Sequence, residues 1–230
     1  MKIVFLAQEL SGLTGGVIYD EILYKKVKSI FGDSLTLYTD KSFGEEHDDE
    51  TLHFKRFNKI YDDHLLELTD CDYLFINSRM YTCFGTFPWN QVNKNCKIIL
   101  IHHHFNFMTQ KNPLKYFVHK HLELSFLQRA KKIITPNPYT LNTLNKFGFS
   151  ERSMLLEAYN TCIDYKDIED KEKYILFIGT VEPRKGIDLG IDAFYQFSKV
   201  ISGYDFLIAG TFKQNSAYCK KLLGKVRKYN

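Results

Sequence analysis

The sequence YILFIGTVEPRKGIDLGIDAF, residues 174–194, decides how this chain folds. Its first five residues are apolar, Gly179 ends the run, and the turn EPRKG leads into a segment with helical spacing of apolar residues. A strand, a tight turn and a helix in this order form the repeating unit of a parallel α/β sheet. Because the N–H groups of a first helical turn have no partner within the helix, such a turn can bind an anion.

The turn itself carries two adjacent cations, Arg184 and Lys185. A guanidinium and an ammonium group at the start of a helix indicate a phosphate or a diphosphate as the bound anion. The same residues also fit an ordinary turn between a strand and a helix, with both charges solvated. The spacing alone leaves these two interpretations open.

Short apolar runs alternate with longer amphipathic segments along the whole chain, which predicts an α/β fold with parallel sheets flanked by helices. We expect strands at 3–7, 35–38, 73–77, 97–101, 132–135, 154–157, 174–178 and 205–209. We expect helices at 17–30, 114–130, 139–147, 187–200 and 216–228. In the first helix, the side chains expected to face the sheet are Val17, Ile22, Leu23, Val27 and Ile30.

The charged segment DYKDIEDKEK, residues 164–173, has few apolar residues and is typical of a linker between domains. It predicts an N-terminal Rossmann-like domain at 1–165 and a second Rossmann-like region at 172–230. The second region holds two strand–helix units, whereas half of a doubly wound domain usually needs on the order of 100 residues or more. We therefore expect the first part of a C-terminal domain, which a further segment would complete.

The composition is that of an ordinary globular protein, since 44% of the 230 residues are hydrophobic, 25% are charged and the net charge is +4. So small a net charge does not call for nucleic acid as a partner, although it suits an anionic substrate or a membrane surface. The five cysteines form no CxxC pair, which favours reduced thiols over disulfides or a zinc site. With no signal peptide and no run of about 20 apolar residues, we expect a cytoplasmic protein with peripheral membrane contact at most.

The first junction between a strand and a helix reads LSGLTGG, residues 10–16. Its glycines do not fit G-x-G-x-x-G, which argues against a dinucleotide cofactor and hydride transfer. Gly15 and Gly16 let the backbone approach a ligand closely at the start of a helix. A pure turn role is the alternative for both glycines.

His102, His103 and His104 follow directly on the strand expected at 97–101. Ligands of open α/β sheets bind beyond the carboxyl ends of the strands, so these residues lie where a cleft is expected. Consecutive residues alternate in direction, so at most two of the three share a side. The alternatives are a histidine that contacts the ligand, a structural cluster, and a metal site for which the sequence shows no further ligands.

Residues 111–132 carry several cations around an apolar stripe of Phe117, Leu124 and Leu127. Most such helices pack one side on the protein and expose the other to solvent. Peripheral contact with anionic lipid is the alternative.

Taken in order, these stretches resemble the GT-B glycosyltransferases of family 4, which are retaining enzymes that use nucleotide sugars. KIVFLAQELSGLTGGVIYDEIL is similar to that family's opening strand, glycine loop and helix, and KIILIHHHF is similar to its strand that ends in a histidine. AKKIITPNPYTLNTLNKFGF, YNTCID and FIGTVEPRKGIDLGIDAF are similar to a strand–helix segment, the interdomain element and the start of the nucleotide-binding domain. The resemblance extends over nearly the whole chain, and the last motif is the most specific.

The resemblance implies two facing Rossmann-like domains, with the acceptor on the N-terminal one and the nucleotide sugar on the C-terminal one. It implies transfer of a hexosyl group from a nucleotide-diphosphate sugar to a glycan or a lipid-linked acceptor, with retained configuration. No metal and no other cofactor is implied. The family's commonest setting is synthesis of bacterial surface polysaccharides, which would place the protein in the cytoplasm at the inner face of the membrane.

By the same resemblance, Lys185 binds the donor diphosphate, Arg184 supplies a second cation, and Gly16 lies in the loop beneath the donor phosphates and the acceptor, with Gly15 beside it. His102 falls on the strand-end histidine near the transferred sugar, with His103 in that role if the register shifts by one.

Three departures from the family pattern matter. Gly179-Thr180 replaces the common Gly-Arg pair, and NTCID replaces N-G-V-D in the interdomain element. In the family, the two glutamates, eight positions apart, that hold the donor lie further along the pattern than the stretches matched here. A second interpretation therefore stays open, namely a non-catalytic module that binds an acceptor or a partner and is complemented by a C-terminal segment.

Overall fold

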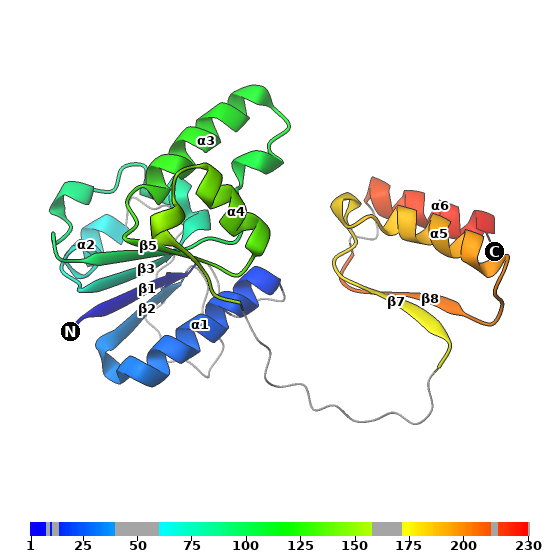
Figure 1. The fold of residues 1–230 in the computed structure, drawn as a ribbon, viewed down its shortest axis with the longest axis horizontal. Helices are drawn as coiled ribbons and strands as arrows, with labels where there is room; N and C mark the ends of the chain where they lie inside the picture. The colour runs from blue at the N-terminus through cyan, green and yellow to red at the C-terminus, as the bar shows by residue number, and fades with distance from the viewer. Residues whose placement is uncertain (8–9, 11–13, 40–59, 158–171, 213–215, 230) are drawn as a thin grey trace. The chain divides into compact units, whose positions relative to one another are not determined.

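The computed structural model of the chain describes residues 1–7, 10, 14–39, 60–157, 172–212 and 216–229. The chain divides into two compact units, Met1–Thr161 and Cys162–Asn230 (Figure 1). The predicted linker at 164–173 lies outside the described residues except for its last two positions, and the YNTCID element lies wholly outside them.

The first unit is built on a six-stranded parallel sheet with the strand order β2-β1-β3-β4-β5-β6. Its strands are β1 (Ile3–Ala7), β2 (Leu35–Thr39), β3 (Tyr73–Asn77), β4 (Lys97–Ile101), β5 (Lys132–Thr135) and β6 (Ser153–Leu155). The chain leaves β1 toward β2 on one side and returns to β3 on the other, so the strand order reverses between β1 and β3. Ligands of doubly wound sheets bind at such a switch point, beyond the carboxyl ends of the strands.

Helices flank this sheet, which confirms the predicted α/β class (Figure 1). The α-helices are α1 (Gly15–Phe31), α2 (Ile60–Thr69), α3 (Pro113–Leu127) and α4 (Pro138–Lys146). Short 3₁₀ helices are η1 (Gly32–Ser34), η2 (Ser78–Phe84), η3 (Trp89–Gln91), η4 (Phe107–Thr109) and η5 (Ser150–Arg152). The sequence did not predict α2, and it placed the end of α3 three residues too late. The chain already turns toward β5 there, because the Lys131 N–H donates to the Ile98 carbonyl at 2.8 Å.

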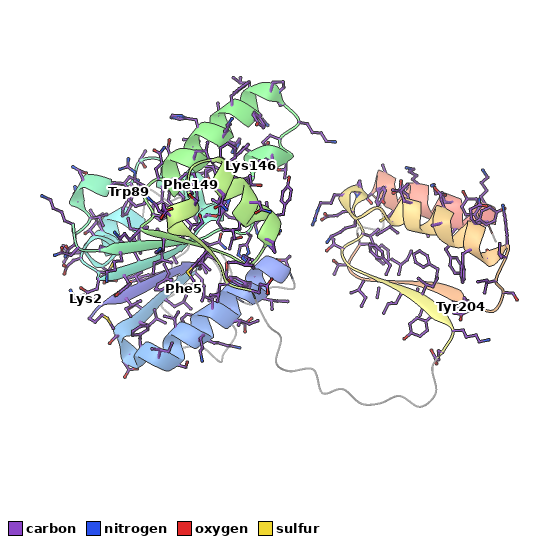
Figure 2. All side chains as sticks on the ribbon, in the orientation of Figure 1. Lys2, Phe5, Trp89, Lys146, Phe149 and Tyr204 are labelled. Carbon is purple, nitrogen blue, oxygen red and sulfur yellow. The ribbon has the colours of Figure 1, made fainter. Side chains whose placement is uncertain are left out.

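The sheet has an apolar core on each side, and β1 contributes to both. Val4 and Leu6 join the core under α2, α3 and α4, whereas Ile3 and Phe5 join the core under α1 (Figure 2 labels Phe5). Alternate side chains of a strand point to opposite faces, so a central parallel strand is apolar at every position. This is why β1 reads as an unbroken apolar run in the sequence.

The predicted sheet-facing stripe of α1 is partly wrong. Ile22 and Ile30 are 39% and 63% exposed. The buried side chains are Val17, Tyr19, Asp20, Tyr24 and Val27. The spacing of residues 17, 20, 24 and 27 follows one side of a helix, and it includes a carboxylate that a purely apolar pattern passes over.

The second unit contains a two-stranded parallel sheet of β7 (Tyr174–Ile178) and β8 (Asp205–Ala209). Its helices are η6 (Pro183–Lys185), α5 (Ile187–Ser198) and α6 (Ala217–Tyr229). The strand–turn–helix order predicted from residues 174–194 is confirmed, with Gly186 in the left-handed conformation (φ 68°) at the junction of turn and helix. Hydrogen bonds join α5 to α6, since Asp192 of α5 accepts from Lys225 and from the Tyr229 hydroxyl of α6.

Helices α5 and α6 lie on the same side of β7 and β8 (Figure 1). Phe177 and Phe206 pack toward the helices. Their neighbours point the other way, and Leu176, Ile178 and Leu207 are 44%, 75% and 44% exposed. Leu176 and Leu207 are partners in the strand register, so they form one apolar face of the sheet.

In the described part of the chain, no helix combines the length and the apolar character that a membrane span requires. Four cysteines in that part, at 71, 83, 96 and 219, are free thiols. Cys162 lies outside the described residues.

Candidate functional site

A buried polar cluster lies at the carboxyl edge of the six-stranded sheet, at its switch point. His103 follows the end of β4, Asn77 is the last residue of β3, and Asp20 comes from the second turn of α1. His103 Nε2 lies 2.8 Å from Asp20 Oδ1, and the exposed fractions of the two side chains are 8% and 2%. The sequence predicted the histidine at this edge but not its carboxylate partner.

Asp20 uses both of its oxygens in this cluster. Oδ2 accepts a hydrogen bond from Asn77 Nδ2, and Oδ1 faces His103 Nε2. The backbone carbonyl of His103 accepts from Thr140 Oγ1 at 2.9 Å, and the Tyr19 ring and the imidazole pack in a T-shaped arrangement with centroids 5.4 Å apart. The cluster therefore fixes the imidazole plane and directs the Nε2 proton toward the carboxylate. Nδ1 has no hydrogen-bond partner among the described residues, so it can accept from a ligand hydroxyl.

Gly16 lies against this imidazole at the start of α1. A Cβ atom at Gly16 would lie 3.7 Å from the ring of His103, and one at Gly15 would meet no atom within 4 Å. Neither glycine has positive φ, so the turn geometry does not require glycine at either position. The helix start has no side-chain cap from Thr14 and no acidic residue in its first turn. Amide donors are thus available next to His103.

His102 has a different environment from His103. Its side chain is fully buried, with Nδ1 2.7 Å from Ser78 Oγ and the ring 4.5 Å from the Phe105 ring centroid. Burial lowers the pKa of His102 to about 3, with smaller contributions from the neighbouring histidines, so the ring is neutral at physiological pH. Nε2 is buried without a hydrogen-bond partner within the described ranges. The geometry therefore favours His103 over His102 as the residue that contacts a ligand.

His102 and His103 turn in different directions. His102 packs against Phe105 on the α3 side of the sheet, whereas His103 faces Asp20 of α1. Among the residues that the structure describes, no group of three His, Cys, Asp or Glu side chains could hold a metal ion.

Glu123 of α3 holds the loop that follows the histidines. It is fully buried and accepts the N–H groups of Asn106 at 3.1 Å and Phe107 at 3.2 Å. Burial raises the pKa of Glu123 to about 7 from its usual 4.5, although the backbone hydrogen bonds act in the opposite direction. The folded protein consequently holds this proton more tightly than the unfolded chain does.

The pKa of Glu123 predicts a pH dependence of stability. Because the pKa of Glu123 is higher in the folded protein than in the unfolded chain, proton binding at Glu123 stabilises the fold. This stabilisation is complete below about pH 4.5 and is lost as the pH rises through about 7. The free energy of unfolding should fall over this window by about 3 kcal/mol more in the wild type than in Glu123→Gln, as measured by urea denaturation. Glu151→Gln, at an exposed glutamate, should follow the wild type. Equal pH profiles for the wild type and Glu123→Gln would contradict the raised pKa.

In the second unit, the predicted cations lie on the exposed η6 turn at the carboxyl end of β7. Arg184 Nε lies 2.7 Å from Glu182 Oε2, with exposed fractions of 70% and 42%. An exposed pair of this kind contributes roughly 0 to 1 kcal/mol, so an incoming anion can displace it. The Lys185 side chain makes no hydrogen bond or ion pair with the described residues, so its ammonium group is available to a ligand.

The start of α5 does not have the open amides that the sequence suggested. The Asp188 N–H donates to the Tyr218 hydroxyl at 3.4 Å, and the Asp188 carboxylate accepts from Tyr218 and Lys221 at 3.0 Å each. A carboxylate in the first helical turn already interacts with the helix dipole and repels a second anion. An anion at this turn would therefore be bound by the side chains of Arg184 and Lys185 rather than by the helix start.

The sequence did not predict that Gly179 and Gly210, which follow β7 and β8, approach each other closely. Gly179 and Gly210 both have φ near 153°, and a Cβ atom at Gly210 would lie 2.0 Å from the carbonyl oxygen of Gly179. The pairing continues past the strands, since the Val181 N–H donates to the Thr211 carbonyl at 2.9 Å. The repeated Gly-Thr after each strand, at 179–180 and 210–211, was the available signal.

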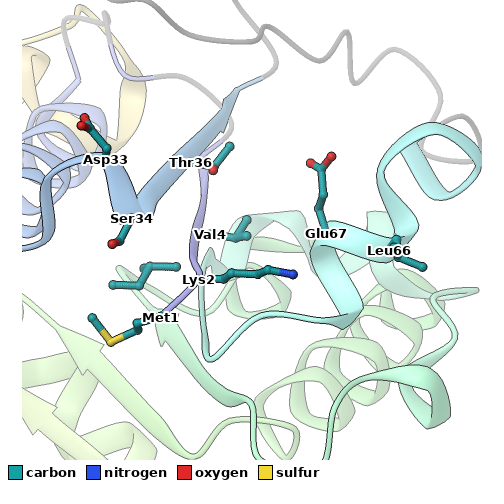
Figure 3. A pocket seen from close by; sticks show the side chains of 9 residues that line it. Met1, Lys2, Val4, Asp33, Ser34, Thr36, Leu66 and Glu67 are labelled. Atoms are coloured by element: carbon teal, nitrogen blue, oxygen red, sulfur yellow. The ribbon is translucent and has the colours of Figure 1, made fainter.

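A hollow of about 560 Å³ lies at the opposite edge of the first sheet. Figure 3 shows its lining at the amino ends of β1 and β2, with Lys2, Asp33 and Glu67 around it. It is separate from the carboxyl edge that carries His103, and it contains none of the predicted site residues.

No protein-family model and no curated protein sequence matches this chain. Among solved structures, it is similar to a mutant of S. aureus TarM in complex with fondaparinux, alpha-GlcNAc-glycerol and UDP. The TM-score is 0.51 at 14% identity, over 69% of this chain and 31% of TarM, so the chain spans about a third of that protein. It is also similar to sucrose-phosphate synthase from Thermosynechococcus elongatus, with a TM-score of 0.71 at 16% identity, over 100% of this chain and 68% of the synthase. At these identities the likeness establishes the fold, which is of the GT-B type.

Proposed function

We propose that this chain belongs to a glycosyltransferase that moves a hexosyl group from a nucleotide-diphosphate sugar to a glycan or a lipid-linked acceptor, with retained configuration. The observation that carries the proposal is the buried Asp20–His103 pair at the switch point of a GT-B fold. The fold likeness to sucrose-phosphate synthase covers the whole chain, and TarM was solved with UDP, which supports a nucleotide sugar as the donor. The free thiols of the described cysteines fit a cytoplasmic location.

Each unit would supply one part of the chemistry. Lys185, with Arg184 released from Glu182, would bind the donor diphosphate and neutralise its charge as it departs. His103 would accept a hydrogen bond from a sugar hydroxyl at Nδ1, held in this orientation by Asp20. Gly16 would let the sugar or the phosphates approach the imidazole and the start of α1. The proposal includes no metal and no other cofactor.

Lys185→Gln tests the diphosphate role. The variant should bind UDP, GDP or ADP, whichever the wild type prefers, about tenfold to fiftyfold more weakly, because one unpaired ammonium group is lost from the phosphate contact. Isothermal titration calorimetry of the full chain with the three diphosphates and their hexose conjugates measures this difference. Lys220→Gln, which removes an exposed lysine from the same unit, should bind like the wild type. Equal affinity of Lys185→Gln and the wild type would remove Lys185 from the site.

The apolar face of the second sheet supports an alternative, a non-catalytic module that binds a partner. Leu176, Ile178 and Leu207 form an exposed apolar face that a complementing segment could cover. In that case the wild type would bind none of the three diphosphates at millimolar concentration, and analytical ultracentrifugation would show self-association that Ile178→Thr reduces. Nucleotide binding by a monomeric chain would exclude the alternative.

A further inference from the structure

Two thiols that the candidate site does not use lie together at the amino edge of the six-stranded sheet. Cys71 lies between α2 and β3, and Cys96 comes directly before β4. Their Sγ atoms are 3.6 Å apart, although the two residues are 25 positions apart in the sequence. The fold, rather than local sequence, therefore brings the two sulfur atoms into contact.

Backbone hydrogen bonds on both sides of the pair hold the two segments side by side. The Asn93 N–H donates to the Thr69 carbonyl at 2.7 Å. The Lys97 N–H donates to the Asp72 carbonyl at 2.9 Å, and the pairing of β3 with β4 begins at the next residue, Tyr73. Adjacent strands lie about 4.8 Å apart, and a disulfide spans Cα–Cα distances of about 4.4–6.8 Å. Rotation of the two side chains can therefore bring the sulfurs to the bonding distance of about 2.05 Å while the strands stay paired.

The two thiols differ in their access to solvent. Cys71 is 2% exposed and belongs to the apolar core, whereas Cys96 packs against that core and is partly exposed. The hydrogen bond from the Cys71 thiol lowers the pKa of Cys96, although burial acts in the opposite direction. The same hydrogen bond, together with burial, raises the pKa of Cys71. Since oxidants react with an accessible thiolate, Cys96 is the thiol that an oxidant in solution reaches first.

We propose that Cys71 and Cys96 form a reversible redox pair, which hydrogen peroxide converts to a disulfide. The Cys96 thiolate attacks one peroxide oxygen, so that an S–O bond forms and the O–O bond breaks. The departing hydroxide takes up the proton that the Cys96 thiol released and leaves as water. The Cys71 sulfur then attacks the Cys96 sulfur, an S–S bond replaces the S–O bond, and the hydroxyl group leaves with the Cys71 proton as a second water. Each sulfur loses one electron, and the two electrons reduce the peroxide.

The state of the pair in this structure fits such a role. Both thiols are free, and disulfides of cytoplasmic proteins are usually transient and sense redox conditions. The other free thiols of the described chain, Cys83 and Cys219, lie in η2 and α6. The pair precedes β3 and β4, at the edge opposite to the one that carries His103. The inference is therefore independent of the proposed sugar transfer, and its test needs no nucleotide.

Peptide mapping by mass spectrometry without reduction tests the proposal on the full chain. The reduced protein is treated with a small excess of hydrogen peroxide, and the remaining thiols are blocked with iodoacetamide before digestion. The main disulfide product should join the peptides that contain Cys71 and Cys96, and dithiothreitol should restore both thiols. The same treatment in concentrated urea should give mixed pairings, because the unfolded chain no longer holds the two sulfurs together.

Two variants separate the roles of the two thiols. Cys71→Ser should leave Cys96 as a sulfenic acid, which dimedone should label about tenfold more than in the wild type. Cys96→Ser should show no such labelling at Cys71, because that thiol is buried. Cys71→Ala serves in place of the serine variant if circular dichroism shows that serine disturbs the core. Cys83→Ser is the matched control, and it should form the same disulfide as the wild type.

A second measurement follows the effect of the bond on the fold. Oxidation should raise the urea midpoint of the first unit by about 1 M, because the disulfide closes the loop from 71 to 96 in the unfolded chain. Cys71→Ser with Cys96→Ser should keep the same midpoint with and without peroxide. Three results would overturn the proposal: both thiols still open to iodoacetamide after peroxide, disulfides that mainly join other cysteines or two chains, or loss of the disulfide in Cys83→Ser.

Discussion

Asp20→Ala is expected to lower the free energy of unfolding of the first unit by about 3 kcal/mol. The Asp20 side chain is 2% exposed, so its removal leaves His103 Nε2 and Asn77 Nδ2 buried without an acceptor. Each unpaired buried donor costs about 1–3 kcal/mol. Urea denaturation followed by circular dichroism measures the change. Asp33→Ala, at an exposed aspartate, should stay within about 0.5 kcal/mol of the wild type. A similarly small change for Asp20→Ala would mean that the cluster does not stabilise the fold.

Asp20→Asn separates the structural role from the proposed positioning role. The amide keeps the shape of the side chain but offers one accepting oxygen, whereas Asp20 accepts from two donors. If the chain transfers a sugar, kcat should fall about a hundredfold with KM for the donor nearly unchanged, because His103 loses its orientation while the diphosphate contacts remain. A proportional loss of folded protein with unchanged kcat per folded molecule would show that Asp20 is structural alone.

Gly210→Ala should disrupt the second unit. The Cβ atom of the alanine would lie 2.0 Å from the Gly179 carbonyl oxygen. In addition, the φ angle of 153° at this position is strained for any residue with a side chain. The backbones of both strand ends would have to separate, so we expect a loss of about 3 kcal/mol or more. Hydrogen–deuterium exchange of the β7 and β8 amides measures it locally, and these amides should become unprotected.

Gly224→Ala is the matched control for this substitution. Gly224 lies inside α6, and a Cβ atom there would meet no atom within 4 Å. Alanine in a helix interior is favoured over glycine by about 1 kcal/mol, so the control should increase protection slightly. Unchanged exchange in Gly210→Ala would show that the two strand ends do not approach as closely as described.

The strands could be predicted closely from the sequence because each is a short apolar run bounded by polar residues or glycine. The bounds of β1, β3, β4, β5, β7 and β8 match the expected ranges. Helix α2 was missed. In its last turns Leu66 is 79% exposed whereas Leu68 is fully buried, and which of these leucines faces the core depends on tertiary packing. Phe117 of α3 was placed on the apolar stripe but is 65% exposed, because an apolar residue was assumed to face the core.

The sequence predicted that His103 and Gly16 lie at the carboxyl edge of the sheet, and their roles toward a ligand stay predictions. Strand ends and glycines indicated the carboxyl edge, where His103 and Gly16 lie. Which of two consecutive histidines turns toward α1 depends on the pleat of β4, and the sequence does not set that. Asp20 follows Gly16 by four residues and so shares its side of the helix, which was an available signal. The partner of Arg184 and the contacts of Asp188 with Tyr218 and Lys221 depend on side-chain packing that no spacing reveals.

Every strand pairing described here is parallel, and this has a consequence for how fast the chain can fold. One edge of β1 pairs with β2, which begins at Leu35, but its other edge, where Ile3 pairs with Tyr73, waits until the ribosome has added about 70 more residues. Since long loops must close before such contacts form, that edge of the apolar central strand stays unpaired until β3 is made. Slow folding and dependence on chaperones during synthesis are therefore expected of the first unit, whatever its activity.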